Sequence, residues 1–248
     1  MEDRKVKPYF IFKGKNSREM GISLLKLPPR TKPERRGELI TVPGRDGFLF
    51  ESEDAYNGKT LEIECTFLPP NGKSQAEIDA LIQDILVWLD GHGDLIFSDY
   101  PNYYYEATII NAIPIERLFK RYRRFMITFE VQPFAKSVLP TVIPITVEDE
   151  QVIDVVSFYD THPKIYLEAS GDIEIHINNT IMHFTDLESP IVIDGELMNV
   201  TDEIGTNMNS HMVGDFPVLT PGENTISILC EEPSEFIQMN IEYRSLWL

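Results

Sequence analysis

The chain has 248 residues, of which 42% are apolar, 10% aromatic and 25% charged, and its net charge is −18. The apolar share excludes an intrinsically disordered chain, and no run of about 18 apolar residues exists that would span a bilayer as a helix. The charged start, residues 1–5, leads into too short an apolar stretch for a signal peptide. At roughly 100–200 residues per domain, the length fits one or two domains.

The charge is distributed unevenly along the chain. Residues 1–137 contain 20 Lys and Arg and 20 Asp and Glu, whereas residues 138–248 contain only Lys164 and Arg244 against 20 carboxylates. This shift predicts two domains, 1–137 and 138–248, with different surroundings. An acidic surface that only improves solubility is one interpretation. The other is that neutral domains associate while acidic domains face solvent or a basic partner.

The first domain is predicted to contain strands around one helix. Residues 38–42 and 48–50 flank the tight loop Pro43-Gly44-Arg45-Asp46-Gly47. Gly44 and Gly47 allow positive φ on either side of an ion-pairing dipeptide, Arg45-Asp46. Residues 60–67 then alternate in polarity, which predicts a strand with Glu62, Glu64 and Thr66 outward and with these side chains inward: Leu61, Ile63, Cys65 and Phe67.

The helix is predicted from about residue 75 to residue 90. Ser74 can cap its start, and Glu77 completes a capping box. Gly91 supplies a left-handed stop after it. Apolar residues at spacings of three and four form a stripe that must lie on a sheet: Ile78, Leu81, Ile82, Ile85, Trp88 and Leu89.

Three consecutive tyrosines, Tyr103, Tyr104 and Tyr105, follow the predicted helix. In a strand they cannot all face one side, so at least one ring is predicted to be exposed or at an interface. A second alternating strand, residues 125–131, comes after a basic segment, residues 117–124. That segment is either an exposed basic edge or a docking surface, and it includes Arg121, Arg123 and Arg124.

Beyond residue 137 the sequence predicts short strands without a helix, which indicates an antiparallel sandwich. Asn178-Asn179 is predicted to turn a hairpin. Direct binding of DNA is not expected here, because neutralising phosphates requires Lys and Arg. The predicted inward side chains include Ile173, Ile175, Ile177, Ile226, Ile228, Cys230, Ile237, Met239, Ile241 and Tyr243.

No motif in the sequence predicts catalysis, a cofactor or a metal. Residues 71–74 end like a phosphate-binding loop but lack its leading glycine. His176 and His183 can meet across the predicted hairpin, where a solvated pair is favoured over a metal site that needs further ligands. A catalytic pair among the 20 carboxylates of the second domain would be a matter of chance. Cys65 and Cys230 are either bridged or, as favoured here, reduced.

These features, in this order, resemble the distal tail (Dit) proteins of siphophages and prophages of Gram-positive bacteria. Residues 214–219 and 221–226 resemble the galectin-like C-terminal domain of that family, whereas residues 241–244 depart from the Pro- and Trp-containing strand expected at the end. The first domain matches through Asn16-Ser17 with Met20-Gly21-Ile22, Pro28-Pro29, Val42-Pro43-Gly44-Arg45-Asp46-Gly47, Trp88-Leu89-Asp90-Gly91, Phe97-Ser98-Asp99-Tyr100-Pro101 and Pro133-Phe134.

The resemblance implies a mainly β fold: an N-terminal β-sandwich or barrel-like domain with one packed helix, and a galectin-like antiparallel β-sandwich. It implies a structural hub at the virion tail tip, made in the host cytoplasm, in which six copies form a ring around a channel for DNA. The ring would join the tail-tube protein to the tail-associated or fibre protein, and the C-terminal domains would carry receptor-binding or baseplate proteins. Sequence-specific DNA binding and membrane insertion are not expected.

Within such a ring, we predict that the loop and the basic edge make ring or partner contacts, together with the tyrosines. The alternative function is a carbohydrate-binding adhesion module that recognises host cell-surface saccharide. Against it, Trp247 is the only Trp of the second domain and lies next to the chain end. The predicted interface residues are Gly44, Arg45, Asp46, Gly47, Tyr103, Tyr104, Tyr105, Arg121, Arg123 and Arg124.

Overall fold

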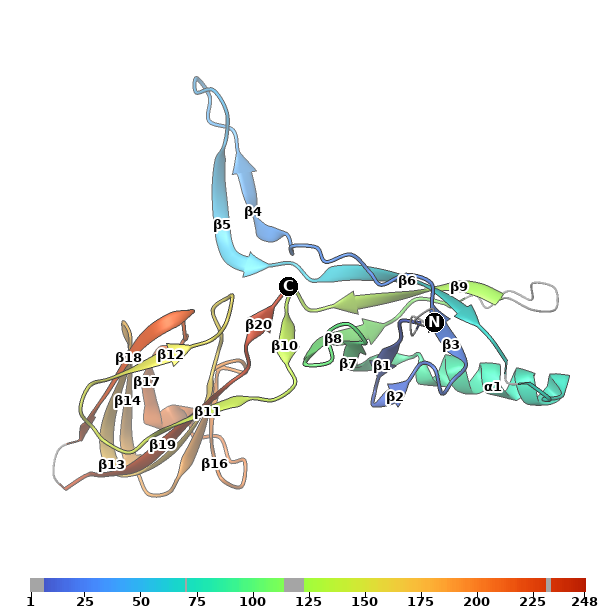
Figure 1. The fold of residues 1–248 in the computed structure, drawn as a ribbon. Coiled ribbons are helices and arrows are strands. Elements are labelled where there is room, and N and C mark those ends of the chain that lie inside the picture. The colour runs from blue at the N-terminus through green and yellow to red at the C-terminus, as the bar shows by residue number, and fades with distance from the viewer. Residues whose placement is uncertain (1–6, 70, 114–122, 231–232) are drawn as a thin grey trace, which may run out of the picture. The chain divides into compact units, whose positions relative to one another are not determined.

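The computed structural model describes residues 7–69, 71–113, 123–230 and 233–248. The chain divides into two compact units, Met1–Ala135 with Leu248, and Lys136–Trp247, called the first and second unit below. Strands dominate both units, and the described residues contain one α-helix, α1 (Gln75–Trp88) (Figure 1). The predicted fold class, mainly β with a barrel-like first unit and one packed helix, is confirmed. No helix within the described ranges has the length and apolar character needed to cross a membrane.

The first unit contains a curled antiparallel sheet with the strand order β2-β1-β7-β8-β9-β6-β3. Its longest pairing is that of β6 with β9, which are in register along nine residue pairs from Lys59↔Val131 to Phe67↔Arg123. Both strands alternate as predicted, and their inward side chains form the core of the unit. The strands are β1 (Phe10–Phe12), β2 (Lys15–Asn16), β3 (Ile22–Leu24), β6 (Lys59–Phe67), β7 (Gly91–Phe97), β8 (Tyr103–Ile109) and β9 (Arg123–Val131).

One side chain of β6 differs from the prediction. Thr66, expected to face outward, is buried. The reason is that β3 pairs with this end of β6, with Ser23 opposite Thr66. The Thr66 hydroxyl donates a hydrogen bond to the Ser23 carbonyl oxygen at 3.4 Å. Alternation identifies the two faces of a strand, but it does not identify which part of the outer face a neighbouring segment covers.

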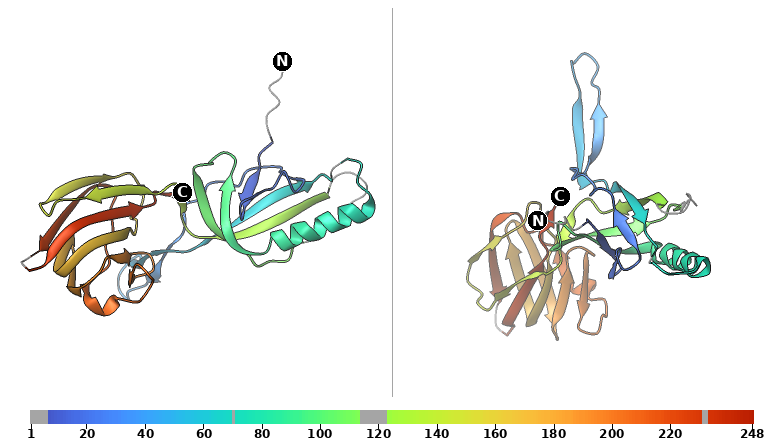
Figure 2. Two further views of the ribbon diagram at one scale, coloured as in Figure 1. Left: turned by 90° about the horizontal axis from the view of Figure 1, so that it is seen from below. Right: turned by 45° about the vertical axis from the view of Figure 1, so that its right-hand side comes forward.

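Helix α1 begins and packs as predicted. The Glu77 carboxylate accepts a hydrogen bond from the Ser74 backbone N–H at 2.8 Å, which completes the capping box. The helix ends at Trp88, and Gly91 adopts the predicted positive φ of 74°. The Trp88 indole donates to the Phe12 carbonyl oxygen at 2.8 Å and stacks on Phe10, with ring centroids 5.7 Å apart. These contacts attach α1 to strand β1 of the sheet. Figure 2 shows the helix running alongside the strands of this unit.

The second unit is an antiparallel sandwich organised around one long strand, β13 (Lys164–Ile177). The first half of β13 pairs with β19 and β15, and its second half pairs with β18 and β14. One layer is therefore β11-β19-β13-β15-β16 and the other is β12-β18-β13-β14-β17. The remaining elements of the sandwich are β11 (Thr141–Ile145), β12 (Gln151–Val155), β14 (Thr180–Leu187), β15 (Ile191–Asp194), β16 (Asn199–Asp202), the 3-10 turn η1 (Asn209–His211), β17 (Met212–Gly214), β18 (Gly222–Cys230) and β19 (Glu235–Tyr243). Strands β10 (Ala135–Ser137) and β20 (Leu246–Trp247) pair with each other and belong to neither layer.

Most of the inward side chains predicted for the second unit are buried, but Ile237 is exposed. The pairing of β13 with β19 shifts register between Glu168 and Ala169, which lie opposite Gln238 and Phe236. This bulge places Phe236 against the core and turns Ile237 outward. A bulge inverts the alternation beyond it, so the sequence pattern alone assigned Ile237 to the wrong face.

The two cysteines are free thiols in this structure. Cys65 is fully buried in the first unit, and burial raises its pKa to about 12. Cys230 is partly buried in the second unit, and its pKa is also raised, first of all by burial. Because the thiolate is the reactive form, both side chains are chemically quiet at neutral pH.

Candidate assembly interface

Strands β4 (Arg35–Ile40) and β5 (Leu49–Tyr56) form a two-stranded sheet of their own. Together with the loop 41–48 they are called the ribbon. In Figures 1 and 2 the ribbon runs away from the larger sheet of the first unit. Every residue of β4 is exposed. An isolated pair of strands is only marginally stable in water, so this geometry favours a ribbon that another surface covers.

The base of the ribbon is polar and is attached to the first unit. The Tyr56 ring packs edge-on against Phe134, with centroids 5.0 Å apart. The Asn57 backbone N–H donates to the Glu34 carbonyl oxygen at 2.9 Å. Arg36 pairs with Glu53 across the strands at 3.2 Å. Exposed ion pairs of this kind contribute little to stability, so the aromatic and backbone contacts fix the base.

The outer half of the ribbon is apolar on both faces. Leu39 lies opposite Phe50, and Ile40 lies opposite Leu49. Because successive side chains of a strand point to opposite faces, the two pairs cover different faces. Leu39 remains 62% exposed and Phe48, at the end of the loop, 63%, and the other three side chains are exposed as well. Exposed apolar side chains on both faces, beside unpaired strand edges, are typical of a protein interaction site.

Gly37 makes the close pairing of the ribbon strands feasible. A Cβ atom at this position would lie 2.2 Å from the Glu51 carbonyl oxygen and 2.7 Å from the Phe50 ring. The register of the two strands also shifts between Arg35 and Gly37. Only glycine therefore allows the Phe50 ring to lie over β4 at this bulge.

The predicted loop forms the tip of the ribbon. Gly44 and Gly47 have φ values of 80° and 82°, which confirms the predicted positive φ. A Cβ atom at either position would meet nothing within 4 Å, so the backbone conformation alone requires glycine. Arg45 and Asp46 are both exposed. Among the contacts of the described residues they form no ion pair with each other, contrary to the predicted ion-pairing dipeptide.

The predicted tyrosines lie in β8, on the main sheet and apart from the ribbon tip. All three are partly buried rather than exposed. Tyr105 packs against Phe97, with centroids 6.4 Å apart, and the Lys59 ammonium lies 5.0 Å from the centre of its ring. Burial raises the pKa of Tyr105. An interface role for the tyrosines stays a prediction.

The structure describes only part of the predicted basic edge. Arg123 and Arg124 belong to β9, and Arg121 lies outside the described residues. Arg124 is exposed, with its Nη1 atom 3.9 Å from the Glu64 carboxylate of β6. Arg124 and the ribbon tip are therefore separate places on the first unit, and a docking role for the basic edge stays a prediction.

The apolar side chains around the loop were missed from the sequence. The run Phe48-Leu49-Phe50 contains the signal, because three successive apolar residues in a strand cannot all face one core. In a hairpin without a third strand, such a run leaves apolar side chains exposed on both faces.

One part of the chain matches a known protein family. Residues 16–131, which include the whole ribbon, match the family described as the phage tail protein RIFT-related domain. The chain therefore contains a phage tail domain. No curated protein sequence matches it.

The fold of this tail protein is that of Dit. It is similar to the crystal structure of SPP1 Dit, which is described as a paradigm of the hub adsorption apparatus in phages that infect Gram-positive bacteria. The TM-score is 0.79 at 13% identity, over 98% of this chain and 100% of that chain. A chain of the phage P2 baseplate in its activated conformation with calcium gives a TM-score of 0.53 at 10% identity, over 97% and 98% of the two chains. The family resemblance drawn from the sequence is thereby confirmed.

Proposed function

We propose that this tail protein is the hub of a phage tail tip. Six copies form a ring around a channel for DNA. The first units join the tail-tube protein to the tail-associated or fibre protein, and the second units carry receptor-binding or baseplate proteins. The protein acts at the virion tail tip after assembly in the host cytoplasm, and its role is structural rather than enzymatic.

The single observation that carries this proposal is the exposed apolar ribbon on the neutral unit. The ribbon offers unpaired strand edges and apolar side chains on two faces, so a neighbouring copy can pair with it and cover it. A head-to-tail contact of this kind generates a closed ring when its rotation closes. The Dit fold and the tail-domain family support the same assignment.

The charge division supports association through the first units. Residues 1–137 have no net charge, whereas residues 138–248 carry −18, so six copies would carry −108 on their acidic parts. Close packing of these acidic parts would be opposed by strong repulsion. The neutral units can approach one another without this cost.

Light scattering after size-exclusion chromatography tests the ring directly. A ring of six should have a mass of about 171 kDa, six times the 28.5 kDa of one chain, and electron micrographs should show an annulus with a central hole. The measurement is made on the protein alone and on the protein co-produced with the neighbouring tail proteins. A monomer in both preparations, or an annulus with the acidic units lining the hole, would refute the proposal.

A further inference from the structure

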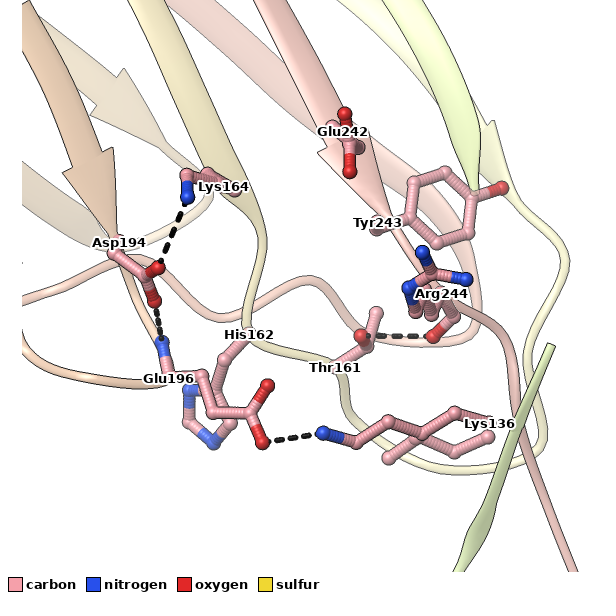
Figure 3. Close-up of a pocket in the computed structure, with 10 residues that line it drawn as sticks. Lys136, Thr161, His162, Lys164, Asp194, Glu196, Glu242, Tyr243 and Arg244 are labelled. Carbon is pink, nitrogen blue, oxygen red and sulfur yellow. Dashed lines mark hydrogen bonds and ion pairs between the residues drawn. The ribbon is translucent and has the colours of Figure 1, made fainter. Parts of the chain in front are cut away.

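All three cations of the second unit line one pocket. Residues 136–247 contain 20 Asp and Glu but only Lys136, Lys164 and Arg244 as Lys or Arg. The three side chains border a pocket of about 180 Å³ together with His162 and the carboxylates of Asp194, Glu196 and Glu242 (Figure 3). A cavity of about 150 Å³ holds a benzene ring, so this pocket has room for one six-membered ring.

The charged side chains of the pocket are held in place before any ligand binds. Lys164 Nζ lies 3.5 Å from Asp194 Oδ2, and Lys136 pairs closely with Glu196. Asp194 Oδ1 also accepts hydrogen bonds from the backbone N–H groups of Glu196 and Leu197 at 3.1 and 3.0 Å. A polar ligand would therefore bind side chains that are already ordered, so binding would cost less conformational entropy.

Arg244 is positioned by the chain itself. Its Nη1 atom donates to the carbonyl oxygens of Ser137 and Val138 at 2.7 and 2.5 Å. Three cations and three carboxylates then balance each other within the pocket, while the other 17 carboxylates of the unit face no further Lys or Arg. The pocket thus combines charged donors with acceptors and has no net charge, in a unit whose overall field repels anions.

An exposed aromatic ring lies beside the pocket on the same sheet face. Tyr166 follows Lys164 by two residues along β13, so both side chains point to the same side. In register, Lys164 lies between Glu242 of β19 and Asp194 of β15, and Tyr166 lies two pairs further along, next to Asn240. Tyr166 is 40% exposed. Its ring can stack on the apolar face of a sugar, while the polar neighbours serve the hydroxyl groups.

We propose that this face of β19, β13 and β15 binds a neutral saccharide. One sugar ring occupies the pocket, where its hydroxyls donate to Asp194 and Glu242 and accept from Lys164. An adjacent ring stacks on Tyr166. The ligand is neutral because the pocket charges balance and the surrounding acidic surface disfavours anions. This site gives the hub a direct contact with cell-surface polysaccharide, and it does not depend on ring formation.

The test uses the full chain on an array of neutral hexose and N-acetylhexosamine oligosaccharides. The tightest binder is then titrated by calorimetry at low and high salt. We expect Kd to change less than about twofold between 0.05 and 0.5 M NaCl, because a neutral ligand has no charge to screen. Tyr166→Ala should weaken binding at least tenfold, whereas Tyr166→Phe, which keeps the ring, should bind within about twofold of the parent protein. Asp194→Asn should weaken binding at least fivefold, while its remaining oxygen can still cap the turn.

Matched controls lie on the opposite layer of the sandwich. Asp154→Asn on β12 and Ile181→Ala on β14 change an exposed carboxylate and an exposed apolar side chain outside the proposed site, and they should leave Kd unchanged. Thermal unfolding of each variant checks that it is folded. A ribbon variant that no longer forms rings should still bind the saccharide, which separates this inference from the proposed function.

Three results would overturn the proposal. The first is the absence of binding to every neutral oligosaccharide on the array. The second is binding restricted to anionic glycans, with an affinity that falls at least tenfold at the higher salt. The third is binding that folded Tyr166→Ala and Asp194→Asn variants retain at the level of the parent protein.

Discussion

Replacing Leu39 and Phe48 together by serine should abolish ring formation without destabilising the single chain. Both side chains are almost two-thirds exposed in the single chain, at 62% and 63%. Complete burial of a large apolar side chain contributes about 1.5–3 kcal/mol, so covering the exposed part contributes about 1–2 kcal/mol for each residue. Each ribbon contact would lose about 2–4 kcal/mol, and a closed ring of six contains six such contacts, which amounts to about 12–24 kcal/mol.

Light scattering and thermal unfolding measure the two sides of this prediction. The double variant should elute as a monomer under conditions in which the parent chain forms rings, and its unfolding midpoint should change only slightly. Leu197→Ser with Ile204→Ser is the matched control, because these residues of the second unit are 73% and 89% exposed. The control should still form rings. Intact rings in the ribbon variant, or a large fall in its unfolding midpoint, would refute the reasoning.

Three smaller perturbations test the local structure of the first unit. Gly47→Val should destabilise the ribbon tip by about 1–2 kcal/mol, because φ is 82° there, and should speed amide hydrogen exchange in β4 and β5 about 5- to 30-fold. Gly47→Asn should have a smaller effect, and equal protection in the two variants would contradict the prediction. Trp88→Phe removes the indole hydrogen bond to the Phe12 carbonyl oxygen and should lower the free energy of unfolding by about 0.5–1.5 kcal/mol in urea titrations; an unchanged midpoint would contradict this. The backbone hydrogen bond from Ser74 lowers the pKa of Glu77 below its ordinary value, so the capping box stabilises the fold above that value and this stabilisation is lost as the pH falls through the folded-state pKa. Glu77→Gln should therefore lower the unfolding midpoint at pH 7 but less below about pH 4. An equal loss at both pH values would contradict this prediction.

Local sequence patterns were sufficient for the elements with one strongly apolar side. The alternation from Leu61 to Phe67 and the stripe on α1 were predicted correctly, because neighbouring residues determine which side of a strand or helix is apolar. Thr66 and Ile237 were assigned to the wrong side. Strand β3 covers Thr66, and the bulged pairing of β13 with β19 turns Ile237 outward. The residues next to Thr66 and Ile237 in the sequence do not indicate these partner strands.

The predicted loop was located correctly, but its surroundings were not. Glycine is favoured where φ is positive, so the residue type alone predicts the backbone conformation at Gly44 and Gly47. The separation of β4 and β5 from the larger sheet is a property of the topology. Without it, the apolar residues on either side of the loop resemble ordinary core positions.

The pocket of the second unit is harder still to predict from the sequence, because its residues are far apart along the chain. Lys136 and Glu196 are 60 residues apart, and Arg244 contacts the carbonyl oxygen of Ser137 across 107 positions. The sequence reveals that cations are scarce after residue 135, but only the antiparallel pairing of β13 with β15 and β19 brings Lys164 between Asp194 and Glu242. The scarcity of cations by itself indicates a solubility or assembly feature, whereas the fold brings the three cations together at one pocket.

The charge of the second unit sets a lower limit on the width of the proposed ring. With three cations and 20 carboxylates, residues 136–247 carry −17. Treated as point charges in water at physiological salt, two such units repel each other by about 5 kcal/mol at about 20 Å and by about 0.2 kcal/mol at about 40 Å. Six neighbouring pairs at the shorter distance would oppose assembly by about 30 kcal/mol, which exceeds the 12–24 kcal/mol estimated above for Leu39 and Phe48. In a six-fold ring the distance between neighbours equals the distance from the axis. At about 25 Å the six pairs would oppose assembly by only about 13 kcal/mol, so the centres of the acidic units should lie about 25 Å or more from the axis in electron micrographs. Centres near 20 Å would show that other contacts, or bound cations, overcome the repulsion.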